Sequence, residues 1–459
     1  MARPFWLTKL LVRSRIARFL PVARRLTDGG TAYLRYYSDT VLAAPTEELL
    51  DPAYFPGPPG PDVIDLNLPA PRVETAVSPG RMSADRRGTP PPWGTAELRN
   101  ALADLFVRRD GRAVDPEAEV LITHGATGAY AATLDAFVNP GDRVVLFDPS
   151  SPLFTLGAKS RRANIRWVPT WTEEGRCRYL VNGFERAMRG AKLLVLSDPV
   201  NPTGACFRPE DLEHIAWIAA AYDVLVYLDE SFIPFRYDGR VRSAAILPGA
   251  EKRVLTAGSV SQGWGLGSVR VGWVAGPKHL IRACTLTASL SAPYVPTVCQ
   301  HLAAQAVGQP DTEFAPTLDQ FRNRRQYVFD RLRTIGLEPE WPGGGYFVWA
   351  VVTGFGLPGQ IGGRGPSPGR TFAERLLKEQ KVLVGPGCIF GPSGGGHIRI
   401  SFAADDGRLR EGLARLAAFV TGLRNPTEDG STSRSVDEVE APEAERQPTD
   451  DAKPVFSRV

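Results

Sequence analysis

The stretch SVSQGWGLGSVRVGW (259–273) combines residue types that can bind an anion. Two hydroxyl residues, Ser259 and Ser261, precede a turn broken by glycines, and Arg270 follows at the start of an expected strand. Hydroxyl groups can donate hydrogen bonds to a phosphate, and an arginine adds a charge-assisted fork. We therefore predict that this segment forms a phosphate-holding loop.

Short apolar segments predict strands that alternate with helices through the middle of the chain. The expected strands are residues 119–123, 143–148, 193–198, 224–230, 253–259 and 270–276. Near-continuous apolar strands separated by helices indicate an α/β fold with a mostly parallel sheet covered on both faces. Ligands of such sheets bind at the carboxyl ends of the strands. The segments THGAT (123–127), SDPVNPTG (197–204), DES (229–231) and SVSQG (259–263) each follow a strand, so we expect them to meet in one crevice.

We expect four parts along the chain. Residues 1–60 form a basic N-terminal arm, residues 61–310 a large domain, residues 311–424 a small α+β domain and residues 425–459 an acidic tail. The tail contains few apolar residues to offset chain entropy, so we expect disorder there. We interpret the arm as packing on its own protein or on a dimer mate, with binding to a membrane surface as the alternative.

Composition excludes several classes of function. The 459 residues carry a net charge of only +4, and no basic stripe interleaved with aromatic residues indicates nucleic-acid binding. The five cysteines are scattered without a metal-ligand spacing, as expected for reduced thiols in a cytosol. No apolar run is long enough to span a membrane, and the N-terminus lacks the features of a secretory signal. We expect a cytoplasmic protein.

Together and in this order, these segments resemble the fold-type I aminotransferases that use pyridoxal 5'-phosphate (PLP), the class I/II family. The resemblance runs from Trp93 to Phe402. It implies the PLP-transferase fold type I, with a mostly parallel central sheet in the large domain and a smaller α+β domain. It also implies an amino-acid-like small-molecule substrate and a homodimer, because the family's site usually lies at a dimer interface.

The resemblance assigns a role to each residue that matches the family's motifs. Asp229 matches the aspartate that pairs with the ring nitrogen, and Asn201 matches the asparagine that hydrogen-bonds the ring O3' and lies beside the substrate. Arg399 in HIRIS matches the arginine that binds the substrate α-carboxylate. The residues that match the phosphate site are Gly125, Ala126, Thr127, Ser259, Ser261 and Arg270.

The sequence departs from the family at the residue that matters most to its chemistry. Gln262 stands where the family has the lysine that forms a Schiff base with the cofactor. A carboxamide is not basic, so Gln262 can neither form that bond nor carry a proton to and from the substrate. Phe232 replaces a tyrosine that usually donates to O3', and Ser151 lies near the place of an aromatic residue that stacks on the ring. Ordinary transamination is therefore not expected.

Three functions remain open. The first is an enzyme of specialised or biosynthetic metabolism that holds PLP or pyridoxamine 5'-phosphate (PMP) non-covalently, with Gln262 or His124 handling hydrogen bonds or protons. The second is a PLP-independent enzyme that uses the crevice for another reaction. The third is a non-catalytic partner or scaffold of an active homologue. We favour an enzyme, because a scaffold has no evident need for Arg399.

Overall fold

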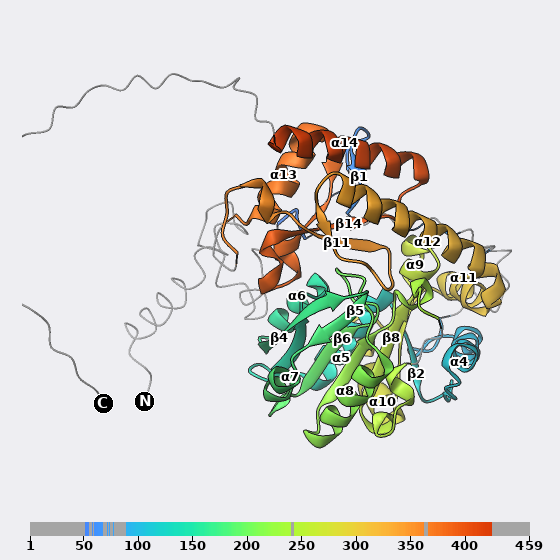
Figure 1. Ribbon diagram of the computed structural model, residues 1–459. Coiled ribbons are helices and arrows are strands. Elements are labelled where there is room, and N and C mark those ends of the chain that lie inside the picture. Colours follow the sequence, from blue (N-terminus) through green and yellow to red (C-terminus); the bar gives the residue numbers. More distant parts are fainter. Residues whose placement is uncertain are drawn as a thin grey trace, which may run out of the picture.

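The chain folds into a large domain and a small domain that lie one above the other (Figure 1). The structure, a computed structural model, describes residues 51–54, 57, 59–67, 71, 73, 77, 89–239, 243–361 and 366–424. The predicted acidic tail, residues 425–459, lies outside the described residues, as does the predicted basic arm up to residue 50.

The large domain contains an eight-stranded sheet in the order β2-β9-β8-β7-β6-β3-β4-β5. The strands are β2 (Val120–Thr123), β3 (Arg143–Asp148), β4 (Asn164–Glu173), β5 (Arg176–Tyr179), β6 (Leu193–Ser197), β7 (Leu225–Asp229), β8 (Val254–Ser259) and β9 (Gly272–Ala275). Strands β4, β3, β6, β7 and β8 run parallel, whereas β9 runs antiparallel to both β2 and β8. The mostly parallel α/β sheet predicted from the sequence is confirmed.

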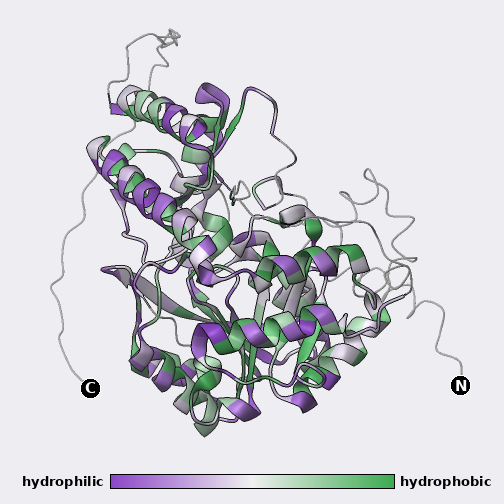
Figure 2. Cartoon of the chain, turned by 90° about the vertical axis from the view of Figure 1, so that its right-hand side faces the viewer, coloured by the Kyte–Doolittle hydropathy of each residue, from purple (hydrophilic) through white to green (hydrophobic). Residues whose placement is uncertain are grey.

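Helices cover both faces of this sheet (Figure 1). The helices of the large domain are α4 (Ala96–Asp110), α5 (Gly125–Phe137), α6 (Pro152–Ser160), α7 (Val181–Met188), α8 (Pro209–Ala221), α9 (Val260–Gly263), α10 (Lys278–Ser291) and α11 (Thr297–Gly308). Helices α5, α6 and α10 pack in one apolar cluster with the sheet, and α7 and α8 pack in another. Hydrophilic and hydrophobic residues alternate along the helices (Figure 2), and the hydrophobic ones bury against the sheet, as expected for amphipathic helices.

The small domain is built around a four-stranded antiparallel sheet in the order β10-β11-β14-β13. Its elements are α12 (Asp311–Thr334), β10 (Glu338–Pro339), β11 (Phe347–Val351), α13 (Pro368–Gln380), β12 (Val382–Leu383), β13 (Gly385–Pro386), β14 (His397–Ser401) and α14 (Asp406–Arg424). One apolar cluster joins the sheet to α12, α13 and α14. These elements agree with the α+β character expected for residues 311–424.

Two features differ from the sequence-based expectation. The short strand β1 (Ile64–Asp65) pairs in parallel with β12 of the small domain, although residues from 61 onward were expected in the large domain. Its partner lies more than 300 residues away, so no local pattern could indicate the pairing. The β4–β5 hairpin was also not expected, since β4 alternates buried and exposed residues only weakly at the sheet edge.

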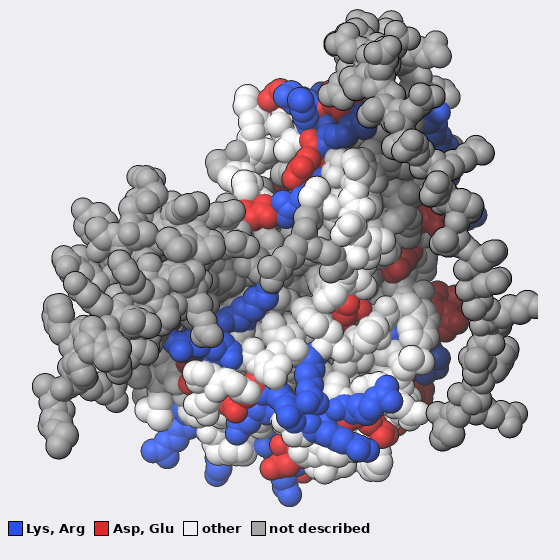
Figure 3. All heavy atoms as spheres, turned by 90° about the vertical axis from the view of Figure 1, so that its left-hand side faces the viewer, with Lys and Arg blue, Asp and Glu red and all other residues white. Residues whose placement is uncertain are grey.

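The described surface mixes charge with a few large apolar side chains. On the face shown in Figure 3, Lys and Arg side chains are interspersed with Asp and Glu side chains. Large apolar side chains are most exposed on α10, where Leu286 is 64% and Leu290 90% exposed. Within the described part of the chain, no helix combines the length and apolar character that crossing a membrane requires.

Candidate active site

The four polar segments meet at the carboxyl ends of the parallel strands, as predicted. They line a cavity of about 160 Å³ in the large domain. The lining residues are Ala126, Thr127, Ser151, Leu153, Ser197, Asn201, Asp229, Ser231, Phe232, Ser259, Ser261, Gln262 and Arg270. No lysine is among these described lining residues. Residues up to 144 positions apart in sequence thus share one cavity because adjacent parallel strands end at the same sheet edge.

One end of the cavity is suited to an anion. Helix α5 begins at Gly125, and no side chain caps its first turn, so its N-terminal backbone N–H groups remain available. Arg270 supplies a positive charge and forms only long hydrogen bonds from NH1, at 3.4 Å to Ser261 Oγ and 3.4 Å to the Gly267 carbonyl. No ion pair of Arg270 occurs among the described residues. A cation and a helix N-terminus without an acidic partner favour a bound phosphate.

Close packing between the helix start and Arg270 requires glycine at two positions. Gly125 has a φ of +70°, and a Cβ there would lie 2.6 Å from Arg270 NH2. A Cβ on Gly272 would lie 2.6 Å from the Ala126 backbone nitrogen. Both glycines therefore let the Arg270 segment approach the start of α5, which brings guanidinium and backbone donors to the same end of the cavity.

The cavity wall also carries a buried acid. Asp229 ends β7, and its Oδ1 accepts a hydrogen bond from the Ser231 backbone nitrogen at 2.9 Å. Burial raises the pKa of Asp229, and the hydrogen bonds from Ser231 partly oppose this effect. Because burial disfavours the ionised form of Asp229, a cationic group in the cavity, such as a protonated ring nitrogen, would stabilise the carboxylate.

Gln262 lies on α9 at the edge of the cavity and contacts the small domain. The Tyr346 hydroxyl, just before β11, donates a hydrogen bond to Gln262 Oε1. Burial raises the pKa of Tyr346, so its hydroxyl stays protonated at neutral pH. The Phe232 ring packs edge-on against Tyr346, with ring centroids 5.3 Å apart. At this place the cavity wall offers neutral hydrogen-bonding and aromatic groups rather than a base.

Arg399, in the middle of β14, is a buried cation among neutral acceptors. Its NH1 donates to Asn201 Oδ1 at 2.7 Å, and its NH2 donates to Asn67 Oδ1 at 2.8 Å and to the Asn67 carbonyl at 3.0 Å. Burial lowers the pKa of Arg399 to about 10, against the opposing fields of Tyr346 and Asp65, so the side chain stays charged at neutral pH. Phe347 and Phe390 flank the guanidinium at 4.5 Å and 4.7 Å.

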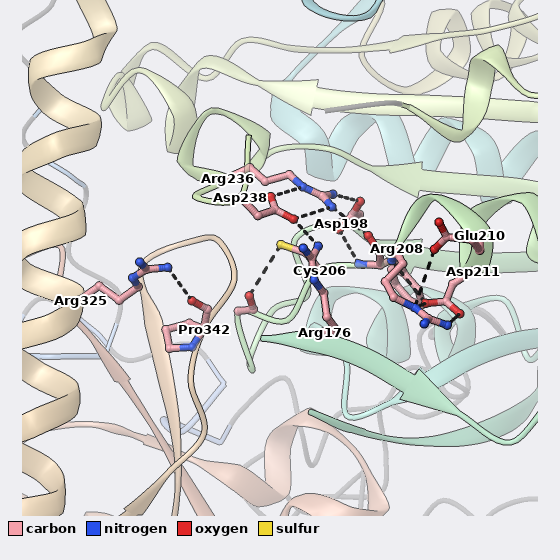
Figure 4. Close-up of polar contacts among 12 residues, drawn as sticks. Arg176, Asp198, Cys206, Arg208, Glu210, Asp211, Arg236, Asp238, Arg325 and Pro342 are labelled. Atoms are coloured by element: carbon pink, nitrogen blue, oxygen red, sulfur yellow. Dashed lines mark hydrogen bonds and ion pairs between the residues drawn. The ribbon is translucent and has the colours of Figure 1, made fainter. Parts of the chain in front are cut away.

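A second network supports the loop that carries Asn201 (Figure 4). Asp198 Oδ2 accepts a hydrogen bond from Arg236 NH1 at 2.5 Å, and Asp198 Oδ1 accepts from the Phe207 backbone nitrogen at 3.1 Å. Arg236 also bonds Asp238 Oδ1 at 2.9 Å, and Asp238 in turn pairs with Arg176. These contacts tie both ends of the 198–207 loop to the segment after β7. The loop position, and with it Asn201, is thereby fixed.

The predicted site residues divide by where the structure places them. All the predicted site residues except His124, Gly125 and Arg399 line the cavity. Gly125 is the first residue of α5, and Arg399 contacts the lining residue Asn201 through a hydrogen bond. His124 precedes α5 without capping it and is not among the described lining residues, so its role as an acid or base stays a prediction. Asn67 and Tyr346 were not predicted, because neither belongs to a motif of the sheet edge. Only the approach of the small domain makes them neighbours of Arg399 and Gln262.

A larger cavity of about 270 Å³ lies next to this site and shares Ser259 with it. Its wall is mainly apolar and includes Leu105, Trp273 and Phe314. The larger cavity lacks Asp229, Arg270 and Gln262, so we assign the candidate active site to the smaller one.

Comparison with known proteins agrees with this geometry. Residues 66–416 match the family model described as aminotransferase class I and II. Arginine–pyruvate transaminase AruH of Pseudomonas aeruginosa is 31% identical over 369 residues, which cover 78% of this chain and 88% of that protein. The putative aminotransferase YugH of Bacillus subtilis is 28% identical over 328 residues, covering 71% of this chain and 82% of YugH. The crystal structure of the aromatic aminotransferase from Pyrococcus horikoshii OT3 is similar with a TM-score of 0.72 at 28% identity, over 79% of this chain and 97% of that one.

Proposed function

Since this chain belongs to the class I and II aminotransferase family, we propose that it holds PLP or PMP without a covalent bond and acts on an amino-acid-like substrate. The observation that carries this proposal is the composition of the 160 Å³ cavity. Groups that suit the cofactor line it, including Asp229 and Arg270, while Gln262 stands on α9 and no described lining residue is a lysine.

The described residues fit the cofactor at both of its charged ends. The N-terminus of α5, Ser259 and Arg270 would hold the phosphate, since these donors face the cavity without an acidic partner. Asp229 would lie against the ring nitrogen, and a protonated nitrogen would compensate the buried carboxylate. When bound, the pyridine ring supplies an electron sink for the substrate carbon attached to it.

Gln262 and Tyr346 determine what the protein can do at the reacting carbon. The carboxamide of Gln262 cannot form a Schiff base, and the Tyr346 hydroxyl stays protonated and donates a hydrogen bond to Gln262 Oε1. This pair would orient polar groups of the ligand and exclude bulk water, without removing a proton itself. A second residue, or the substrate, has to move the proton. His124, next to α5, is our candidate.

Arg399 supports a substrate that carries an α-carboxylate. It is a charged group buried at the edge of the site, and its acceptors among the described residues are the neutral oxygens of Asn67 and Asn201. An anion at this place would compensate the guanidinium directly. A homodimer is part of the same proposal, supported by the exposed apolar side chains of α10, and light scattering would measure its mass.

Calorimetric and absorbance titrations with PLP and with PMP test the proposal. We expect at least one of them to bind with micromolar affinity, and bound PLP to be released intact by denaturation because no covalent bond forms. The variants D229A and R270A should each weaken binding by about tenfold or more, because charge-assisted hydrogen bonds contribute about 1.5–3 kcal/mol. The variant N323A serves as a control, because Asn323 is exposed on α12, away from the cavity. Failure of both ligands to bind would refute the proposal and favour a scaffold or a cofactor-independent enzyme.

A further inference from the structure

The hydrogen bonds of Arg399 occupy both terminal guanidinium nitrogens, the two groups with which an arginine can bind a carboxylate. A carboxylate meets a guanidinium with two oxygens, one on each of two nitrogens. Here two amide oxygens take these positions: Asn201 Oδ1 lies 2.7 Å from NH1, and Asn67 Oδ1 lies 2.8 Å from NH2. The contacts come from different domains, since Asn201 lies on the large-domain loop and Asn67 follows β1.

The protein positions Asn67 for this contact through its backbone. Strand β1 pairs with β12, and the Leu66 carbonyl accepts a hydrogen bond from the Ser401 backbone nitrogen at 2.7 Å. The Asn67 backbone nitrogen donates to Asp65 Oδ1 at 2.8 Å, which fixes the turn after the strand. Gly385 provides the space, because a Cβ there would lie 2.8 Å from Asn67 Oδ1. The carboxamide is therefore held beside Arg399 by several independent contacts.

The contact is nevertheless electrostatically incomplete. Asn67 and Asn201 offer only neutral oxygens, and the Nε of Arg399 is buried without a hydrogen-bond partner. The hydrogen bonds from the Arg399 guanidinium to the two carboxamides are already charge-assisted, but a carboxamide oxygen carries only a partial charge, so a carboxylate would add the attraction of a full opposite charge. Replacing the Asn67 oxygen by an anionic oxygen would thus be favourable for Arg399.

We propose that the Asn67 carboxamide stands in for the substrate carboxylate on Arg399 in the ligand-free protein and must move away when a carboxylate ligand binds. Asn67 is then a specificity-determining residue. It keeps the buried guanidinium hydrogen-bonded between ligands, and it lowers the affinity for carboxylates by the strength of the contact that they displace. This inference rests on the proposed function, because the carboxylate is placed relative to PLP or PMP in the same cavity.

Two ligands that differ only by the carboxylate-bearing part isolate the effect. PMP occupies the cofactor site alone, whereas N-(5'-phosphopyridoxyl)-L-alanine, a stable secondary amine, adds an α-carboxylate. The ratio of their dissociation constants, measured by calorimetry, reports the carboxylate contact with Arg399. We expect N67A to increase the preference for the alanine adduct by about tenfold, the effect of removing one competing hydrogen bond to a charged group. The dissociation constant of PMP should stay unchanged and shows that the variant is folded.

Further variants distinguish displacement of the Asn67 carboxamide from an unspecific change in the shape of the site. N67D should abolish the preference, because its carboxylate pairs with Arg399 permanently. G385A keeps the carboxamide but pushes it away from Arg399, so it should act in the same direction as N67A. R399K should remove the preference in both the wild-type and the N67A background, and N323A should change neither ligand.

The outcomes are distinguishable. If PMP binds but N67A leaves the preference within about twofold of wild type, Asn67 is a permanent structural partner of Arg399 and the inference is wrong. If PMP does not bind wild-type protein at all, the proposed function fails first, and the inference fails with it.

Discussion

The Tyr346 hydroxyl of the small domain donates a hydrogen bond to Oε1 of Gln262 on α9, at the edge of the candidate cavity. Tyr346 also packs against Phe235, which follows β7, and against Phe321 of α12, so an apolar cluster shared by the two domains fixes its position. The contact therefore joins the two domains at the edge of the candidate cavity. Because a carboxamide and a protonated hydroxyl are both neutral, neither partner supplies a base at this edge of the cavity.

We expect the variant Q262K to bind PLP covalently. An amine at this position can form a Schiff base with the aldehyde of PLP if the rest of the site still holds the cofactor. The protein should turn yellow, and borohydride reduction followed by mass spectrometry should show one added cofactor per chain. Q262M is the matched control, since it has a similar length and no amine, and it should remain colourless. A Q262K protein that binds PLP but yields no reduced adduct would mean that residue 262 does not face the aldehyde.

The variant D229N should be more stable than wild type at neutral pH but should bind the cofactor more weakly. Because burial raises the pKa of Asp229, the folded protein binds this proton more tightly than the unfolded chain does. Ionisation of Asp229 then costs stability as the pH rises from the unfolded pKa, about 3.9, through the higher folded pKa. Below about pH 4 the cofactor-free D229N and wild-type proteins should be equally stable, and the variant should gain on wild type as the pH rises to neutrality.

Two measurements check this trade between stability and affinity. Thermal melts of both proteins between pH 4 and 8 give the stability difference, and the raised pKa values of Asp148 and Asp198 cancel in it. Calorimetry at pH 7 should show about tenfold or greater loss of PMP affinity in D229N, because a charge-assisted contact is lost. Equal PMP affinity in the two proteins would argue against a ring nitrogen beside Asp229.

The variant G125A should damage the phosphate end of the site. Its side chain would have to adopt a φ of +70° and would approach Arg270 NH2 to 2.6 Å. We expect a loss of about 1–2 kcal/mol of stability from the backbone conformation, together with weaker binding of PMP and of inorganic phosphate. G308A is the matched control, because nothing lies within 4 Å of a Cβ at Gly308. Unchanged phosphate binding in a folded G125A protein would contradict the assigned phosphate site.

Removal of Asp198 should destabilise the protein strongly. Arg236 and Asp198 are both buried, so D198A leaves the guanidinium with only the half-buried Asp238 as an acidic partner. We expect a loss of about 3–5 kcal/mol, the cost of breaking a buried ion pair. D319A, which removes an exposed pair on α12, should change the unfolding free energy by less than about 0.5 kcal/mol. Urea denaturation measures the unfolding free energies of the D198A and D319A variants. If D198A loses as little stability as D319A, the network of Figure 4 is not needed for folding.

Much of the large domain could be predicted from the sequence, because its signals are local. The apolar runs that became β3 and β8 begin and end within a residue of their predicted limits, since a strand buried on both faces needs a continuous apolar segment. Asp229 could be predicted for the same reason, because it ends β7, whereas Arg270 lies two residues before β9 and not within the strand that was expected to begin there. The β4–β5 hairpin could not, because its edge position leaves a mixed pattern of burial.

The sequence by itself determined the sheet, the groups at its carboxyl edge and the absence of a basic side chain at residue 262. Tertiary structure alone decided which groups from the small domain complete the site. Asn67 comes next to Arg399 only because β1 pairs with β12, and Tyr346 comes next to Gln262 only because the segment before β11 meets α9. These contacts depend on domain packing between residues that are up to 332 positions apart. No local propensity encodes such a separation, because the burial that selects the pairing exists only after the chain has folded.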